Sequence, residues 1–183
     1  MEPAHYIFVD IDGVLNTRNH LVRQQKNTGQ CSGKIWCPIA CNNLRRLCKN
    51  YGARIVVSST WRHYYDLDGL KWYFSENGID EENIIGTTPA DASQPDGQNY
   101  CRGHEIADWL RDNASPNPSY LILDDTPDML QPQGDRFVQV NPVEGFACPQ
   151  AFMRALQIMN QVSGYGFTKS AVANGKYENN GSV

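Results

Sequence analysis

Three short apolar runs, each followed at once by polar side chains, constrain the fold of this 183-residue chain more than any other feature. The runs are rich in β-forming residues, are too short for helices, and cover residues 6–9, 53–57 and 119–123. Stretches with helical periodicity separate or follow them, near residues 38–50, 66–77, 103–113 and 149–162. Weaker strands are expected at 83–86 and 136–140. Strands that alternate with helices predict an α/β fold, a Rossmann-like three-layer parallel sheet flanked by helices.

The polar residues that follow the three runs are expected to meet at one place. In an open parallel sheet, ligands bind outside the carboxyl ends of the strands. The residues at these ends are Asp10 and Asp12 after the first run, Ser58 and Ser59 after the second, and Asp124 and Asp125 after the third. Together they predict a site with both acidic and hydroxyl groups.

Asp10 and Asp12 stand two positions apart at the end of the first predicted strand, so both carboxylates leave it on the same side. Such a pair repels itself unless a cation lies between the groups or one carboxyl stays protonated. A hard cation with oxygen ligands, such as Mg²⁺, removes the repulsion and creates a phosphate-binding site. Gly13 allows the sharp turn that follows. For this motif taken alone, a solvated acidic turn is the alternative.

The other two strand ends carry weaker motifs. Asp124 and Asp125 are costly to bury together without a cation, although an Asp-Asp-x-Pro turn would also explain them. Ser58 and Ser59 have hydroxyl groups that can donate to a phosphate oxygen, although either serine taken alone is better explained as a helix N-cap. The ordered set of three motifs carries the prediction.

Composition places few limits on function. Sixteen Lys and Arg residues against 20 Asp and Glu residues give a net charge of −4, which does not indicate a nucleic-acid-binding protein. No apolar run approaches membrane-spanning length and the first residues lack signal-peptide character, so we expect a cytoplasmic protein with no membrane partner. The six cysteines include no Cys-x-x-Cys pair, which favours reduced thiols over a zinc site or disulfides.

The three motifs resemble motifs I, II and IV of the haloacid dehalogenase-like (HAD) superfamily. Within it, the chain is similar to the small phosphatase domains of RNA-repair proteins, a subgroup that resembles polynucleotide kinase phosphatases. That subgroup typically has Trp-Arg after the second strand, as in Trp61-Arg62, and a basic residue that opens a later helix, as at Arg102. The resemblance implies a HAD-like phosphatase domain over residues 1–162, followed by a Gly- and Asn-rich tail over 163–183.

The resemblance implies a Mg²⁺-dependent phosphomonoesterase with a covalent intermediate. Asp10 would attack phosphorus and form an aspartyl-phosphate. Asp12 would protonate the leaving oxygen and then activate the hydrolytic water. Mg²⁺ would be held by the Asp10 carboxylate, the Asp12 backbone carbonyl and Asp124, with Asp125 or Asp128 acting through water.

The resemblance also implies residues that hold the phosphate. Ser58 and Arg102 would bind its oxygens, with Ser59 as the alternative to Ser58 at the motif II position. The superfamily usually has a lysine as motif III, and this chain has Arg102 instead. Arginine can hold a phosphate through two hydrogen bonds, so the function can survive with a different geometry. A solvated residue near a helix start is the alternative for Arg102.

Caps in this superfamily are inserted after motif I or before motif III, and here those positions hold only residues 16–36 and 87–101. Both segments are too short for an independently folded cap, so the resemblance implies a capless or minimal-cap domain with an open site. We expect polar loops at 16–37 and 87–101. The oligomeric state is not predicted.

The first of these loops is unusual in charge. From Thr17 to Lys34 it has no acid and five basic or imidazole side chains, Arg18, His20, Arg23, Lys26 and Lys34. A basic segment beside an open site suits a large phosphorylated substrate and slightly favours a polynucleotide end or nucleotide. A phosphoprotein, particularly one with phosphotyrosine, is the alternative substrate, and a non-catalytic Mg²⁺- or phosphate-binding module is the alternative function.

Overall fold

Five parallel strands form one sheet in the computed structural model of the chain, which describes residues 5–28, 36–89 and 101–164. The strands are β1 His5–Val9, β2 Arg54–Val57, β3 Ile84–Thr87, β4 Ser119–Asp124 and β5 Phe137–Gln139. Their order across the sheet is β3-β2-β1-β4-β5. The first motif therefore ends the central strand, and the other two motifs end its two neighbours.

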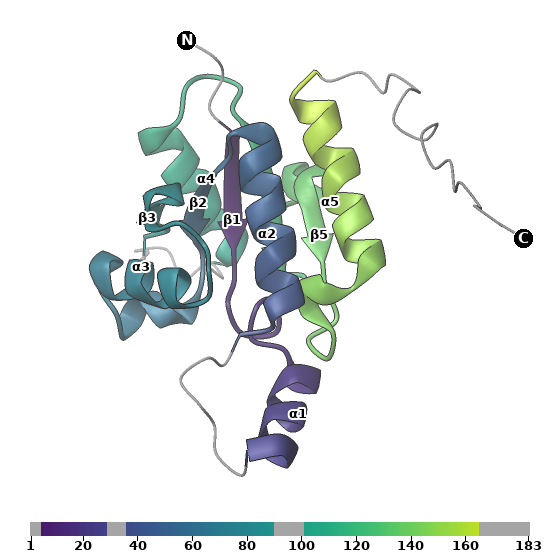
Figure 1. Ribbon diagram of the computed structural model, residues 1–183. Coiled ribbons are helices and arrows are strands. Elements are labelled where there is room, and N and C mark those ends of the chain that lie inside the picture. The colour runs from purple at the N-terminus through teal and green to yellow at the C-terminus, as the bar shows by residue number, and fades with distance from the viewer. Residues whose placement is uncertain (1–4, 29–35, 90–100, 165–183) are drawn as a thin grey trace, which may run out of the picture.

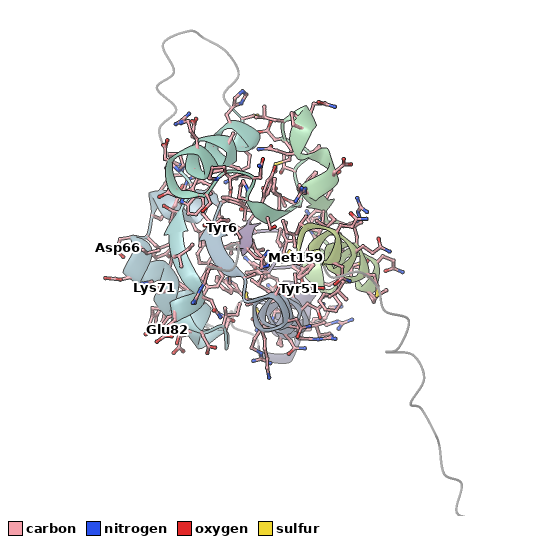
Figure 2. All side chains as sticks on the ribbon, turned by 90° about the horizontal axis from the view of Figure 1, so that it is seen from above. Tyr6, Tyr51, Asp66, Lys71, Glu82 and Met159 are labelled. Atoms are coloured by element: carbon pink, nitrogen blue, oxygen red, sulfur yellow. The ribbon has the colours of Figure 1, made fainter. Side chains whose placement is uncertain are left out.

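Helices cover both faces of the sheet (Figure 1). The α-helices within the described residues are α1 Arg18–Thr28, α2 Pro38–Tyr51, α3 Leu67–Glu76, α4 Arg102–Asn113 and α5 Pro149–Val162. Figure 2 looks along the strands and shows α2, with Tyr51, and α5, with Met159, on one side of the sheet, and α4 on the other. The three layers of the predicted fold are confirmed.

Successive side chains of β1 point alternately into two hydrophobic cores, one on each face of the sheet. Ile7 and Val9 point into the larger core, which α2, α3 and α5 cover. Phe8 points into the smaller core, where its ring meets Trp109 of α4 with centroids 5.4 Å apart. Since successive side chains of a strand point to opposite faces, Asp10 continues the Phe8 side and points toward α4.

Backbone pairing continues past the strand ends and aligns the polar residues. The Asp10 N–H donates to the Leu123 carbonyl, and the Ser58 N–H donates to the Val9 carbonyl, each over 2.9 Å. The Val140 N–H donates to the Asp124 carbonyl over 3.0 Å. These bonds place the three motifs side by side at one edge.

The predicted strands and long helices agree with the observed ones to within one or two residues, but one predicted loop was wrong. Residues 16–37 were expected to be a polar loop, and Arg18–Thr28 instead form α1. This helix lacks an acid in its first turn and a broad apolar face, so its periodicity gave no signal. Thr17 starts it: its hydroxyl accepts from the His20 N–H over 3.3 Å. Much of the other predicted loop, 87–101, and the tail beyond residue 164 lie outside the described residues.

Among the described residues, no helix is both long and apolar enough to cross a bilayer. Cys37, Cys41, Cys48, Cys101 and Cys148 are free thiols. Burial raises the pKa of Cys41 and of Cys48 to about 12. Both of these thiols therefore stay protonated and pack as small apolar side chains of α2.

Gly145 allows the segment before α5 to pack on the loop after β1. Its φ is +57°, and an ideal Cβ there would lie 2.4 Å from the Val14 carbonyl oxygen and 2.5 Å from Thr17 Cγ2. The next residue, Phe146, donates its N–H to the same Val14 carbonyl over 2.9 Å. A side chain at this position would push apart the two segments that hold the motif I loop.

We expect Gly145→Ala to lower the free energy of unfolding by about 2–4 kcal/mol, since it combines left-handed strain with overpacking against backbone. Gly134→Ala is the matched control, because a Cβ on Gly134 meets nothing within 4 Å. The control should change stability by less than about 1 kcal/mol. Urea unfolding of both variants measures the difference, and equal effects would contradict the packing argument.

Candidate active site

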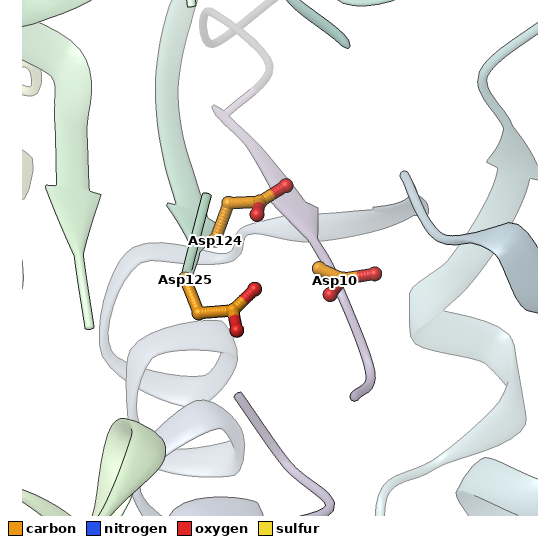
Figure 3. Close-up of side chains that lie close together, drawn as sticks. All are labelled: Asp10, Asp124 and Asp125. Atoms are coloured by element: carbon orange, nitrogen blue, oxygen red, sulfur yellow. The ribbon is translucent and has the colours of Figure 1, made fainter. Parts of the chain in front are cut away.

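Three carboxylates from neighbouring strands lie together at the carboxyl edge of the sheet (Figure 3). Asp10 follows β1, Asp124 ends β4, and Asp125 comes next in the chain. One oxygen from each lies within 4.8 Å of the other two. Asp10 is 7% exposed and Asp124 is 2% exposed, while Asp125 is half-buried. We call these three residues the acidic cluster.

Burial dominates the protonation of the two inner members. It raises the pKa of Asp10 to about 6, although the Ser59 hydroxyl and the Arg102 guanidinium act in the opposite direction. It raises the pKa of Asp124 to about 7, and the neighbouring Asp10 carboxylate adds to that rise. A cation between the carboxylates would favour their ionised forms and release their protons.

The acidic cluster fits a hard divalent cation such as Mg²⁺. Its donors are carboxylate oxygens, which that ion prefers over nitrogen or sulfur. The Thr126 N–H donates to Asp124 Oδ1 over 2.9 Å and so fixes the orientation of that carboxylate. Gly13 leaves room for Asp125: with a φ of +79°, its ideal Cβ would lie only 2.5 Å from Asp125 Oδ2. The turn after β1 is therefore shaped around the cluster.

Asp12 lies outside the acidic cluster and is exposed. Two neighbours orient its carboxylate: Trp61 Nε1 donates to Oδ2 and Asn16 Nδ2 donates to Oδ1, each over 2.8 Å. Its side chain is thus held beside the cluster and open to solvent. That position suits proton exchange with a substrate better than metal coordination through the carboxylate.

The two serines after β2 differ in their contacts. The Ser59 hydroxyl hydrogen-bonds with the Asp10 carboxyl and accepts from the Trp61 N–H over 3.4 Å. Ser58, which the sequence favoured for the motif II position, is buried, and its hydroxyl has no hydrogen-bond partner among the described residues. An unpaired buried hydroxyl is costly unless a ligand or water completes it. Both serines therefore stay candidates, Ser59 by its contact and Ser58 by its free hydroxyl.

Arg102 opens α4 and points at the acidic cluster. Its Nε lies 3.6 Å from Asp124 Oδ2, and its charge lowers the pKa of Asp10 and of Asp124. Asp128 anchors the start of the helix, because its carboxylate accepts from the Arg102 N–H over 3.1 Å. Asp128 is therefore engaged with α4 and is not part of the acidic cluster. The helix dipole disfavours a positive charge at a helix start, and here the neighbouring carboxylates of Asp124 and Glu105 compensate for it.

A partly buried chain of ion pairs lies next to Arg102. Glu105 lies 3.8 Å from Arg102 Nη1 and 2.6 Å from Arg62 Nη2. Arg62 has only 4% of its side chain exposed and donates from Nη1 to the Ser59 carbonyl over 2.6 Å. Burial lowers the pKa of Arg62, while Glu105 opposes this. These contacts link the segment after β2, at Ser59, to Arg102 at the start of α4.

Sequence reasoning assigned no function to four of these residues, namely Asn16, Trp61, Arg62 and Glu105. Trp61 and Arg62 form a dipeptide that is typical of the RNA-repair subgroup, and Asn16 is the last residue of motif I. Nothing in the sequence around Glu105 indicates a function, because an acid in the first turn of a helix is common. Only the packing of α4 against the segment after β2 brings it between two arginines.

Comparison with known proteins supports the resemblance. The model of the family described as "HAD domain in Swiss Army Knife RNA repair proteins" matches residues 6–151. The match runs from β1 to the start of α5 and includes every candidate residue named above. No curated protein and no solved structure gave a significant match.

The raised pKa values predict how metal binding depends on pH. Asp10 and Asp124 have folded-state pKa values of about 6 and 7, above their ordinary value of 3.8, so the folded protein holds these protons more tightly than the unfolded chain. Stability without metal therefore falls as pH rises from about 4 to about 7. Mg²⁺ must displace the same protons, so we expect its affinity to drop at least ~100-fold between pH 8 and pH 5.

The rise in melting temperature on adding MgCl₂ measures this effect at both pH values. We expect a clear increase near pH 8 and little or none near pH 5. Asp124→Asn should abolish the increase, whereas the exposed Asp135→Asn should leave it unchanged. A shift that is equal at both pH values would show that Mg²⁺ does not bind the acidic cluster.

Proposed function

The chain belongs to the family of HAD domains found in Swiss Army Knife RNA repair proteins, and from this premise we propose that it is a Mg²⁺-dependent phosphomonoesterase. One observation carries the proposal: Asp10, Asp124 and Asp125 gather at the carboxyl edge with Arg102 beside them. A cation on the carboxylates and the guanidinium would together attract a phosphate group, which then lies against the Asp10 carboxylate.

In this proposal Asp10 is the nucleophile. Its carboxylate attacks phosphorus, an aspartyl-phosphate forms, and the bond from phosphorus to the leaving oxygen breaks. Asp12 gives a proton to that oxygen and later takes one from the water that hydrolyses the intermediate. The Asp10 and Asp124 carboxylates and the Asp12 backbone carbonyl would hold Mg²⁺, with Asp125 beside them. When bound, this ion would neutralise charge between carboxylate and phosphate.

The phosphate oxygens would be held by Arg102 and by the hydroxyl of Ser58 or Ser59. Arg102 is supported from behind by Glu105, so its guanidinium needs little reordering when a phosphate arrives. Ser59 already contacts Asp10, so a phosphate bonded to Asp10 would lie within its reach. These donors would stabilise the charge that develops on the oxygens during transfer.

The substrate we propose is a polynucleotide end or a nucleotide. Figure 1 shows α1 beyond the carboxyl ends of the strands, on the side where the acidic cluster lies. Its side chains Arg18, Arg23 and Lys26 are exposed. An open, basic surface next to a phosphate site favours a polyanion over a phosphotyrosine peptide. Lys34, also expected in this basic segment, lies outside the described residues.

Asp10→Asn tests the nucleophile. An amide neither attacks phosphorus nor binds Mg²⁺ well, so release of phosphate from p-nitrophenyl phosphate should fall by at least ~1,000-fold. Asp135→Asn, an exposed substitution of the same type, should keep wild-type activity. Activity of Asp10→Asn within a few-fold of wild type would show that this carboxylate is not the nucleophile.

Asp12→Ala tests the proton donor. We expect loss of about 100-fold or more on an alkyl phosphate, because its leaving oxygen needs a proton. The loss on p-nitrophenyl phosphate should be much smaller, because nitrophenolate leaves without one. Mg²⁺ should still raise the melting temperature of this variant, since Asp12 contributes only its backbone. Equal losses on the two substrates would argue against proton donation by Asp12.

A further inference from the structure

Aromatic side chains gather beside Asp12, on the segment after β2 and on α3. Trp61 lies in the 3-10 turn Thr60–His63, Tyr65 follows that turn, and Tyr73 belongs to α3. The ring centroids of Trp61 and Tyr65 are 5.6 Å apart, those of Trp61 and Tyr73 5.2 Å, and those of Tyr65 and Tyr73 4.8 Å. We call these three residues the aromatic cluster.

The aromatic cluster is rigid on its inner side and open on its outer side. The buried Trp36 supports Trp61, with centroids 5.9 Å apart, and packs in turn on Phe74. The Tyr73 hydroxyl donates to the Tyr65 hydroxyl over 3.1 Å, and Tyr65 is 38% exposed. Since these rings are already fixed, a planar ligand would bind without first ordering them.

The aromatic cluster is directly connected to the proposed general acid. Trp61 donates its indole N–H to Asp12 over 2.8 Å, and Asp12 is the group proposed to protonate the leaving oxygen. The part of the substrate attached to that oxygen must therefore pass next to Trp61. In a nucleotide the base is joined to the ester oxygen through the sugar, so it lies several bonds beyond the phosphate and can turn onto the exposed surface of the aromatic cluster.

We propose that the aromatic cluster is a stacking site for the terminal nucleobase of a phosphorylated polynucleotide. The inference rests on the proposed function, since it places the scissile phosphate at Asp10. Every base has a π-face, so Trp and Tyr rings can hold a strand end without reading its sequence. The site would select for a base next to the phosphate and not for a particular base.

Charge favours a polynucleotide over a phosphotyrosine peptide as the occupant. Exposed Arg18, Arg23 and Lys26 give α1 a basic surface beyond the same edge of the sheet. Asp66 and Asp68 lie at the start of α3, close to Tyr65 in the chain, and would repel phosphates there. The further phosphates of the strand are therefore expected to run toward α1 and away from α3.

Binding to the Asp10→Asn protein tests the stacking site independently of turnover. Two labelled oligonucleotides with a terminal phosphate serve as probes, one with a base on the terminal nucleotide and one abasic there. Fluorescence anisotropy should show that Tyr65→Leu weakens binding of the first roughly ten-fold and leaves the second unchanged. Tyr64→Leu is the control, because this neighbour is 79% exposed and lies outside the aromatic cluster; it should bind both probes normally.

Equal weakening of both probes, or of neither, would overturn the stacking site. So would a larger loss of binding to a phosphotyrosine peptide than to the first oligonucleotide. The proposed function is checked separately by phosphate release from the wild-type protein. Base-dependent binding without any release of phosphate would overturn the enzymatic proposal and leave the aromatic surface as a nucleobase site.

Substitutions of Trp61 separate its two contacts. Trp61→Phe keeps a ring but loses the N–H donated to Asp12, so kcat should fall while KM for the oligonucleotide changes little. Trp61→Leu loses both and should raise KM about ten-fold as well. In an Asp12→Ala background, Trp61→Phe should lower kcat no further. An equal rise of KM in both Trp61 variants would contradict stacking on this ring.

Discussion

The mutual repulsion of carboxylates buried at one strand edge is the constraint on which the rest of this structure depends. Asp10 and Asp124 end neighbouring parallel strands, and pairing of β1 with β4 forces them together. Both are almost fully buried, which raises their pKa values toward neutrality. A fold selected only for stability would avoid this arrangement, because burial of these like charges lowers stability as the pH rises from about 4 to about 7. A cation and a phosphate group would turn the same arrangement into a binding site.

The surrounding residues hold this arrangement in place. Gly13 keeps Asp125 beside Asp10, since a side chain there would collide with its carboxylate. Gly103 has a similar effect on Arg102: a Cβ on Gly103 would lie 2.4 Å from the Leu130 N, so the start of α4 lies in direct contact with the backbone of the segment after β4. The Gly103 N–H and carbonyl are also both bonded, to the Asp128 carbonyl and to Gln133. Arg102 therefore faces the acidic cluster from a fixed helix start.

Two lines of residue contacts extend outward from the acidic cluster. Through Arg102, Glu105 and Arg62, a chain of charges connects the acidic cluster to the Ser59 carbonyl. Through Asp12, Trp61 and Tyr65, hydrogen-bond and ring contacts connect the proposed proton donor to an exposed aromatic surface. In the proposed function the first line would hold the phosphate, and the second would contact the group to which the phosphate is attached. Both lines include a residue of the short turn after β2, Ser59 in the first and Trp61 in the second.

Local sequence determined the strands, the long helices and the acids at the strand ends. Each of these depends on the residue types within a short stretch of chain, because the spacing of apolar residues indicates whether that stretch is a helix or a strand. Short continuous apolar runs predicted β1 and β4, and Asp10, Asp12 and Asp124 followed from their ends. The helix α1 was not predicted because it lacks the broad apolar face that produces helical periodicity, although Thr17 caps its start. Tertiary structure alone decided which serine touches Asp10, that Glu105 lies between two arginines, and that Trp61 orients Asp12. Those contacts join segments up to 49 residues apart, and only the packing of elements around the sheet brings them within hydrogen-bond distance.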